Sequence, residues 1–259
     1  MIDFTGPGTP LGKDAFDAAT AKLGCDAPTL WALLHVETLG CGYQPDRKPK
    51  ILFERHIFHR LTGGKYDAQA PDISQPTAGG YGAAGAHQYD RLAAALALDE
   101  TAALSSASWG LGQIMGGNHA AAGYATVQDM VTAFVGNEAA QLEGMAAFIA
   151  ASNLADDVAS GNWAAYALHY NGQDYAKNQY DSRLATAHQT YVNHGCPDLA
   201  VRAAQIMLSY LPAYHPGLID GVMGDTTAAA LRQYQADKGL PQTGLPDAAT
   251  LMALATPPE

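Results

Sequence analysis

Residues 26–42 read DAPTLWALLHVETLGCG, and this stretch decides the fold expected for the first part of the chain. Its leucines at positions 30, 33 and 34 recur at the spacing of one helix face, and Glu37 continues that face. Asp26 has the side chain of an N-cap, and Gly40 is a residue type at which helices commonly end. We therefore expect a helix with an apolar face and a carboxylate in its last turn.

The rest of the chain is dominated by the same helical spacing. The longest apolar stripe follows Thr126 and runs over residues 127–149, which predicts one long helix. Another helix is expected over residues 163–170, and only residues 50–53 have the features of a strand. Residues 62–86 are rich in Gly, Pro, Ser and Ala and predict a long loop, which at this length is usually functional. The fold class is therefore mainly α.

A break in the helical spacing at residues 193–198 divides the chain. After it come three apolar segments with helical spacing, separated by turns that contain glycine or proline. We expect two helical domains, a large one over residues 1–193 and a small one over residues 198–259, and we expect them to act independently.

Composition excludes several classes of protein. The 259 residues are 48% hydrophobic and 15% charged, the opposite of a disordered chain. The net charge of −11 argues against nucleic acid as a partner. No apolar run approaches the ~18 residues of a membrane span, and the N-terminus lacks the pattern of an ordinary signal peptide. We expect a monomer that does not insert stably into membranes.

Cysteine and histidine spacing gives no sign of a cofactor or a metal. Cys25, Cys41 and Cys196 are expected to be reduced, although the first two could form a pair. His56 and His59 lie three residues apart, but no third ligand follows at an obvious spacing. We expect neither metal nor cofactor.

Glu37 has the setting of a general acid. An acid that protonates a glycosidic oxygen at neutral pH needs a raised pKa, which burial and a negative potential produce. Glu37 continues an apolar face and lies where the helix dipole presents its negative end. A solvated glutamate near a helix end is the plainer alternative.

The C-terminal segment resembles the three-helix peptidoglycan-binding module over residues 199–255. The matching positions are Asp220, Gly221, Gly224, Thr227, Leu231, Tyr234, Gln235, Gly239, Leu240, Pro241, Thr243, Gly244, Asp247, Thr250 and Leu254. Most of them are expected to hold turns, helix starts or the core, with Tyr234 in the core. This resemblance implies bacterial peptidoglycan as the partner.

The large domain resembles the lysozyme-like superfamily. Three motifs occur in the expected order, namely His35–Gly40, Ser108–Met115 and His169–Gly172. With the segment Pro49–His56 between them, residues 20–192 look more closely like the N-acetylmuramidase family of phage endolysins. The resemblance implies a lysozyme-like helical fold and an enzyme that cleaves the glycan of the cell wall. It also implies synthesis in the host cytoplasm and action on the wall, in the periplasm, after membrane permeabilisation.

Site residues follow from this resemblance position by position. Glu37 matches the general acid, and Ser108, Gln113, Tyr170 and Asn171 match substrate-binding positions. Independently of the resemblance, Glu54 is a candidate second carboxylate, because it follows an apolar triplet and precedes Arg55 and His56. A residue in the first turn of a helix or an ion pair is the alternative.

A further glutamate, Glu138, lies on the apolar stripe and is expected to pair internally rather than to act on substrate.

Several alternatives remain open at the level of sequence. Lytic transglycosylases manage with one glutamate, so hydrolysis and transglycosylation are not separated. A zinc amidase, a Cys–His peptidase and a non-catalytic wall-binding protein are less favoured. Finally, residues 44–65 hold six of the fourteen Lys and Arg residues, and we expect this basic segment to flank Glu37 and meet the anionic wall.

Overall fold

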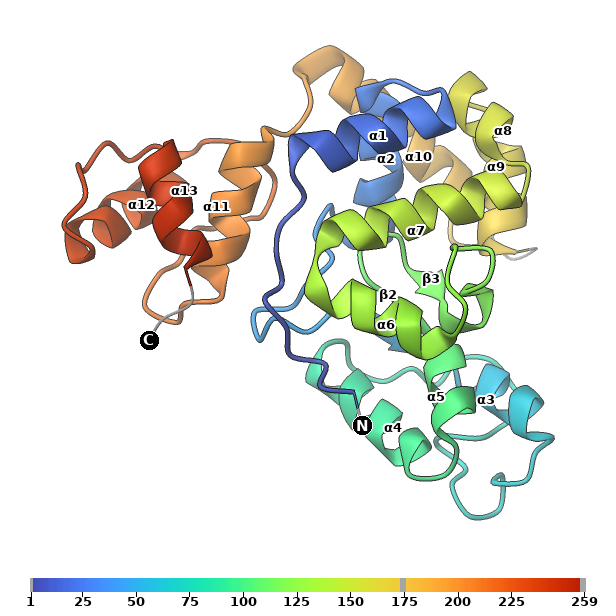
Figure 1. The fold of residues 1–259 in the computed structure, drawn as a ribbon. Coiled ribbons are helices and arrows are strands. Elements are labelled where there is room, and N and C mark those ends of the chain that lie inside the picture. Colours follow the sequence, from blue (N-terminus) through green and yellow to red (C-terminus); the bar gives the residue numbers. More distant parts are fainter. Residues whose placement is uncertain (1, 173–175, 257–259) are drawn as a thin grey trace.

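The computed structural model describes residues 2–172 and 176–256 and is mainly helical (Figure 1). The N-terminal domain contains α1 (Lys13–Leu23), α2 (Ala27–Thr38), β1 (Ile51–Phe53), α3 (Arg55–Thr62), α4 (Ala86–Leu96), α5 (Glu100–Ser105), β2 (Ala107–Trp109), β3 (Ile114–Met115), the 3-10 helix η1 (Gly116–Asn118), α6 (Val127–Gly136), α7 (Glu138–Ala151), α8 (Ala155–Ser160), α9 (Trp163–Asn171) and α10 (Tyr180–His194). The C-terminal domain contains α11 (Leu199–Ser209), α12 (Asp225–Asp237) and α13 (Ala248–Ala255).

Helix α2 forms as the sequence predicts and lies in the centre of the N-terminal core. The Asp26 carboxylate accepts a hydrogen bond from the backbone N–H of Thr29, so it is the N-cap. Leu30, Leu33 and Leu34 are buried, and α10 packs along the helix. Leu39 caps the C-terminus in the left-handed conformation. Because both ends are held, the position of Glu37 in the last turn is well defined.

The prediction of one long helix over residues 127–149 is wrong. The chain breaks at Asn137, whose φ of −160° and ψ of 155° are extended. Its side chain caps α7 by accepting from the N–H of Ala140. Apolar spacing continues across the break because both helices bury their faces in the same core, so periodicity alone does not reveal the kink.

A small antiparallel sheet lies beside these helices, in the order β1–β2–β3. The strand expected at residues 50–53 is confirmed as β1, which pairs Leu52 with Ser108. Strands β2 and β3 were not predicted, because two or three residues are too few to show an alternating pattern. The turn that joins them carries residues 110–113.

The long loop is confirmed over residues 63–85, and α4 holds it in place. Arg91 donates to the carbonyl oxygens of Asp72 and Tyr81. Gln88 donates to the carbonyl oxygens of Tyr81 and Ala83. The loop is therefore attached to the protein at several points along its length.

The C-terminal domain has its own small core, in which Tyr234 is buried as predicted. Two buried amides organise its turns. Gln205 accepts from the N–H of Gly221, and Gln235 accepts from the N–H of Gly244. Both glycines have positive φ, so the turns need the conformational freedom of glycine.

The two domains meet through buried polar contacts on α11. Arg202 is 1% exposed and forms a two-pronged ion pair with Glu138 at 2.8 and 2.7 Å. Tyr210 donates to the carbonyl oxygen of Gly8, and Arg47 lies over the Tyr210 ring. These contacts join the two domains physically, and their independent action stays a prediction.

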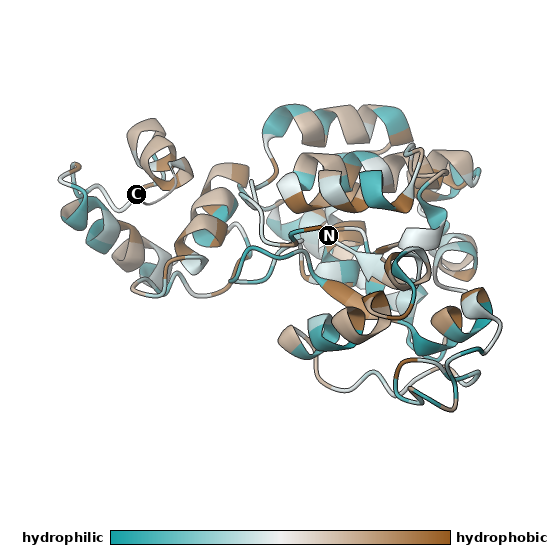
Figure 2. Cartoon of the chain, turned by 60° about the horizontal axis from the view of Figure 1, so that its bottom comes forward, coloured by the Kyte–Doolittle hydropathy of each residue, from teal (hydrophilic) through white to brown (hydrophobic). Residues whose placement is uncertain are grey.

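Figure 2 shows both hydrophobic and hydrophilic residues along the helices of the two domains. Helices that pack one face against a core carry both kinds of residue. In the described part of the chain no helix is long and apolar enough to cross a membrane.

Candidate functional site

Glu37 lies in the last turn of α2, partly buried, among tyrosines of α9 and α10. Burial raises the pKa of Tyr170, and the nearby Glu37 carboxylate raises it further. Burial and then Glu37 also raise the pKa of Tyr180. The pKa of Tyr166 is raised by burial, by Tyr170 and by Glu37. The carboxyl group of Glu37 therefore lies close to a group of three tyrosines, Tyr166 and Tyr170 of α9 and Tyr180 of α10.

The turn between β2 and β3 is held against this group. Thr38 donates to the carbonyl oxygen of Leu111 at 3.0 Å, which attaches the turn to the end of α2. Tyr170 donates to the carbonyl oxygen of Gly112 at 2.7 Å, which attaches it to α9. The three motifs that contain Glu37, Gly112 and Tyr170 therefore meet at one place, although about 130 residues separate the first from the last.

Ser108 and Gln113 hold the hairpin together. Ser108 donates to Oε1 of Gln113 at 2.9 Å, and Nε2 of Gln113 donates to the carbonyl oxygens of Gly110 and Lys50. Their polar groups are thus engaged in shaping the turn, and contact with substrate stays a prediction. Asn171 ends α9, and its side chain lies outside the described residues.

A buried amide side chain on α7, which was not predicted from the sequence, holds the 110–113 turn. Gln141 of α7 accepts from the N–H of Leu111 at 2.7 Å and donates to the carbonyl oxygen of Phe134 at 2.7 Å. It also packs where a side chain on Gly110 would lie. The sequence feature that could have indicated this role is a second polar residue on the apolar stripe, three residues after Glu138, because a buried polar side chain needs hydrogen-bond partners.

Three cations bind the end of α2. The carbonyl oxygens of residues 38, 36 and 40 accept from Lys50 Nζ, Arg183 Nη2 and Arg202 Nε at 2.9, 3.0 and 2.6 Å respectively. These positive charges oppose the negative potential of the helix end, on which the sequence argument for Glu37 relied. Lys50 belongs to the basic segment that was expected to flank Glu37, whereas Arg183 of α10 and Arg202 of the C-terminal domain were not predicted to lie here.

Other basic residues of the 44–65 segment point elsewhere. Lys48 pairs with Asp46 and lies over the Tyr89 ring, and Arg47 lies over Tyr210. Of the three lysine and arginine residues at positions 47, 48 and 50, only Lys50 contacts the end of α2.

Glu54 lies at the far end of β1 and forms a separate polar group. Its Oε2 is 3.1 Å from Nδ1 of His56, although the two atoms lack hydrogen-bond alignment. Burial raises the pKa of Glu54, while His56, Tyr81 and Arg91 lower it, and burial dominates. By strand alternation Glu54 shares a sheet face with Leu52, which is paired with Ser108.

Glu138 is paired internally, as predicted. It is fully buried against Arg202, and its two oxygens also accept from the N–H groups of Gly42 and Leu11, both at 2.8 Å. Glu138 therefore joins the domain interface to the segment that follows α2.

All three cysteines are free, so the alternative of a Cys25–Cys41 pair is not realised. Within residues 2–172 and 176–256 no group of three or more His, Cys, Asp or Glu side chains could hold a metal ion.

This arrangement defines a class of protein. A buried helix that ends in a glutamate, faced by a small sheet and enclosed by helices, is a lysozyme-like fold, and a three-helix peptidoglycan-binding domain is attached to it.

Comparison with known proteins gives the family. Residues 26–192 match the N-acetylmuramidase family, and residues 198–254 match a putative peptidoglycan binding domain. The chain belongs to the N-acetylmuramidase family. It is similar to the crystal structure of the Burkholderia AP3 phage endolysin, with a TM-score of 0.65 and 37% identity over 71% of this chain and 72% of that one. No curated protein matches the chain.

Proposed function

We propose that this protein cleaves the β-1,4 bond between N-acetylmuramic acid and N-acetylglucosamine in bacterial peptidoglycan, with Glu37 as the general acid. The observation that supports this proposal is the meeting of Glu37, Tyr170 and the 110–113 turn, three elements far apart in the sequence. Membership of the N-acetylmuramidase family and the peptidoglycan-binding domain support the same substrate.

In this proposal Glu37 gives its proton to the glycosidic oxygen as the bond breaks. Tyr170, stacked on Tyr166 at 4.9 Å, limits the access of water to the acid. The backbone of residues 110–113 forms the opposite wall. Because Tyr170 donates a hydrogen bond to the carbonyl oxygen of Gly112, the distance between Glu37 and this wall is fixed.

Glu54 is the candidate for a second carboxylate. It directly follows β1, whose other end, Ile51, pairs with Trp109 next to the turn. If Glu54 takes part as a base that activates water, the reaction inverts the sugar; if it acts as a nucleophile, the reaction retains its configuration.

Transglycosylation is the second candidate, because the elements that meet at the proposed site, Glu37, Tyr170 and the 110–113 turn, include a single glutamate. A single glutamate suffices when the sugar's own 6-hydroxyl attacks, in which case the product is a 1,6-anhydro sugar.

The test is mass spectrometry of muropeptides released by Glu37→Gln and wild-type protein. Glu143→Gln is the matched control, because Glu143 is an exposed glutamate on α7. We expect release to be lost in Glu37→Gln and kept in the control. Reducing ends indicate hydrolysis, products lighter by one water indicate transglycosylation, and freed peptides with intact glycan would refute both. Wild-type release by Glu37→Gln would refute the role of Glu37.

We further propose that the protein acts as a monomer on the cell wall after membrane permeabilisation. The peptidoglycan-binding domain and the similarity to a phage endolysin support the place of action. Sedimentation of the purified chain tests the monomer, and lysis of intact against permeabilised cells tests the requirement for permeabilisation.

A further inference from the structure

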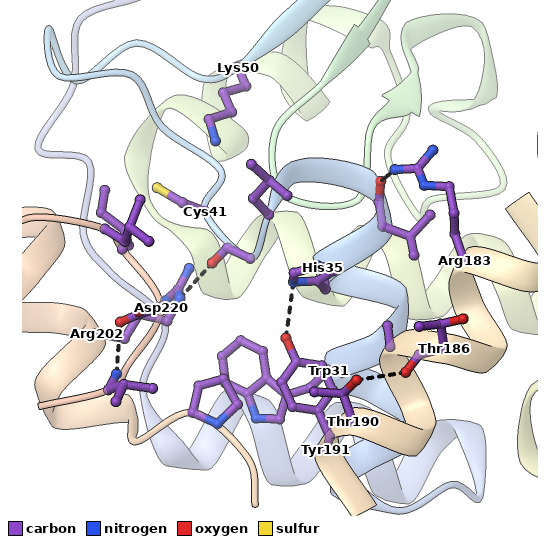
Figure 3. Close-up of a pocket in the computed structure, with 18 of the residues that line it drawn as sticks. Trp31, His35, Cys41, Lys50, Arg183, Thr186, Thr190, Tyr191, Arg202 and Asp220 are labelled. Atoms are coloured by element: carbon purple, nitrogen blue, oxygen red, sulfur yellow. Dashed lines mark hydrogen bonds between the residues drawn. The ribbon is translucent and has the colours of Figure 1, made fainter. Parts of the chain in front are cut away.

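A groove of about 810 Å³ lies between the two domains (Figure 3). One wall is formed by α2 and α10 of the N-terminal domain, and the other by residues 217–222 of the C-terminal domain. Neither the family comparison nor the mechanism proposed above gives this groove a role.

The groove gathers exposed apolar side chains. Of the eight large hydrophobic residues that are exposed in the described part of the chain, three line it, namely Leu39, Leu218 and Val222, at 67%, 78% and 62% exposure. They come from both domains. Since a cluster of this kind is costly to leave in water, it marks a binding surface.

The groove also reaches the last turn of α2, the turn in which Glu37 lies. Lys50 and Arg183 line it, and they hold the carbonyl oxygens of Thr38 and Val36, the residues on either side of Glu37. Figure 3 shows the two cations on either side of the last turn of α2. Lysine has three donors and arginine five, so each retains donors for a ligand after these bonds are made.

Arg202 joins the two walls and itself lines the groove. Its ion pair with Glu138 and its bond to Gly40 attach the C-terminal domain to the end of α2. A groove whose walls are already joined loses little ordering entropy when a ligand binds.

We propose that this groove binds the stem peptide of the peptidoglycan strand whose glycan lies at Glu37. This inference rests on the function proposed above. Every N-acetylmuramic acid can bear a short peptide with free carboxylates and small alkyl side chains. Lys50 and Arg183 complement the carboxylates, and Leu39, Leu218 and Val222 complement the alkyl groups. The glycan and its peptide would thus be held by one continuous surface that both domains build.

The test compares two substrates, peptidoglycan glycan that bears stem peptides and the same glycan after the peptides are removed. The measured quantity is the ratio of kcat/KM on the first to kcat/KM on the second. The variant is Leu218→Gln with Val222→Gln in the full chain. The matched control is Leu245→Gln with Met252→Gln, because these two residues are also exposed and apolar in the C-terminal domain but lie outside the groove.

We expect the ratio to fall about tenfold in the groove variant, which corresponds to about 1.4 kcal/mol, and to keep its wild-type value in the control. A wild-type ratio in the groove variant, or an equal loss on both substrates, would overturn the proposal. Calorimetric binding of a soluble disaccharide–peptide to full-length Glu37→Gln protein separates the two proposals. Such binding should weaken with the groove substitutions whether or not Glu37 is the acid.

Discussion

The Arg202–Glu138 ion pair should decide whether the two domains stay together, and Arg202→Met tests this. Both side chains are at most 1% exposed, and the pair is bound through two hydrogen bonds of 2.7 and 2.8 Å. Removing the cation leaves Glu138 buried with only the N–H groups of Leu11 and Gly42 as partners. Breaking a buried pair in this way costs about 3–5 kcal/mol.

The assay is urea unfolding of the full chain, followed by circular dichroism and by tryptophan fluorescence. Trp31 is a suitable reporter, because its ring lies 5.7 Å from the Arg202 guanidinium. At about 2–4 °C per kcal/mol, the same loss lowers Tm by about 6–20 °C. Arg202→Met with Glu138→Leu should recover part of it, since replacing both partners with apolar residues is often neutral. A loss below about 1 kcal/mol in Arg202→Met would refute the reasoning.

This prediction extends to truncation. A chain that ends before residue 198 lacks Arg202 and so must bury Glu138 uncompensated. We therefore expect deletion of the C-terminal domain to weaken cleavage of soluble glycan fragments as well as wall binding. Equal cleavage of soluble fragments by the truncated and full-length proteins would show that the domains are independent after all.

Three further predictions concern the site and its surroundings. Gly110→Ala should lower the free energy of unfolding, measured by urea titration, by about 1–3 kcal/mol, because residue 110 has a φ of +67° and an added Cβ meets the Gln141 side chain. An unchanged urea midpoint would contradict this contact between residue 110 and Gln141. The pKa of Glu54 is raised by burial, so the folded state holds its proton more tightly than the unfolded state and stability should fall as pH rises through the folded pKa. Glu54→Gln should flatten that slope in unfolding titrations from about pH 4 upward, and a slope equal to wild type would show that Glu54 is not its source. Lys50→Gln should reduce the salt sensitivity of wall lysis more than Lys48→Gln, since Lys48 is paired with Asp46, and equal salt profiles would contradict the placement of Lys50 at the site.

Much of the fold could be predicted because its signals are local. The N-cap and apolar face of α2, and Gly40 just after its Leu39 cap, all lie within residues 26–42, so the helix and the place of Glu37 follow from neighbours in the chain. The same holds for Tyr234 in its small core. The kink at Asn137 escaped prediction, because the apolar spacing is the same on both sides of it.

The surroundings of Glu37 were only partly visible in the sequence. The motifs around Gly112 and Tyr170 indicated that these residues meet Glu37, yet the bond between them is a tertiary contact. Lys50, Arg183 and Arg202 bind the carbonyl oxygens of residues 38, 36 and 40 from three separate elements. Lys50 lies in the basic segment that was expected to flank Glu37, but no periodicity links it to Arg183 and Arg202, so only the folded chain brings the three together.

The sequence by itself determined a mainly helical chain with a glutamate at the end of a buried helix and a separate helical segment after residue 198, since helix caps, apolar faces and turn glycines act between near neighbours. The tertiary structure decided that the C-terminal domain supplies Arg202 to that helix end and that a groove runs between the domains. The physical reason is burial. Glu138 can be buried in the N-terminal domain because a cation 64 residues further along the chain neutralises it.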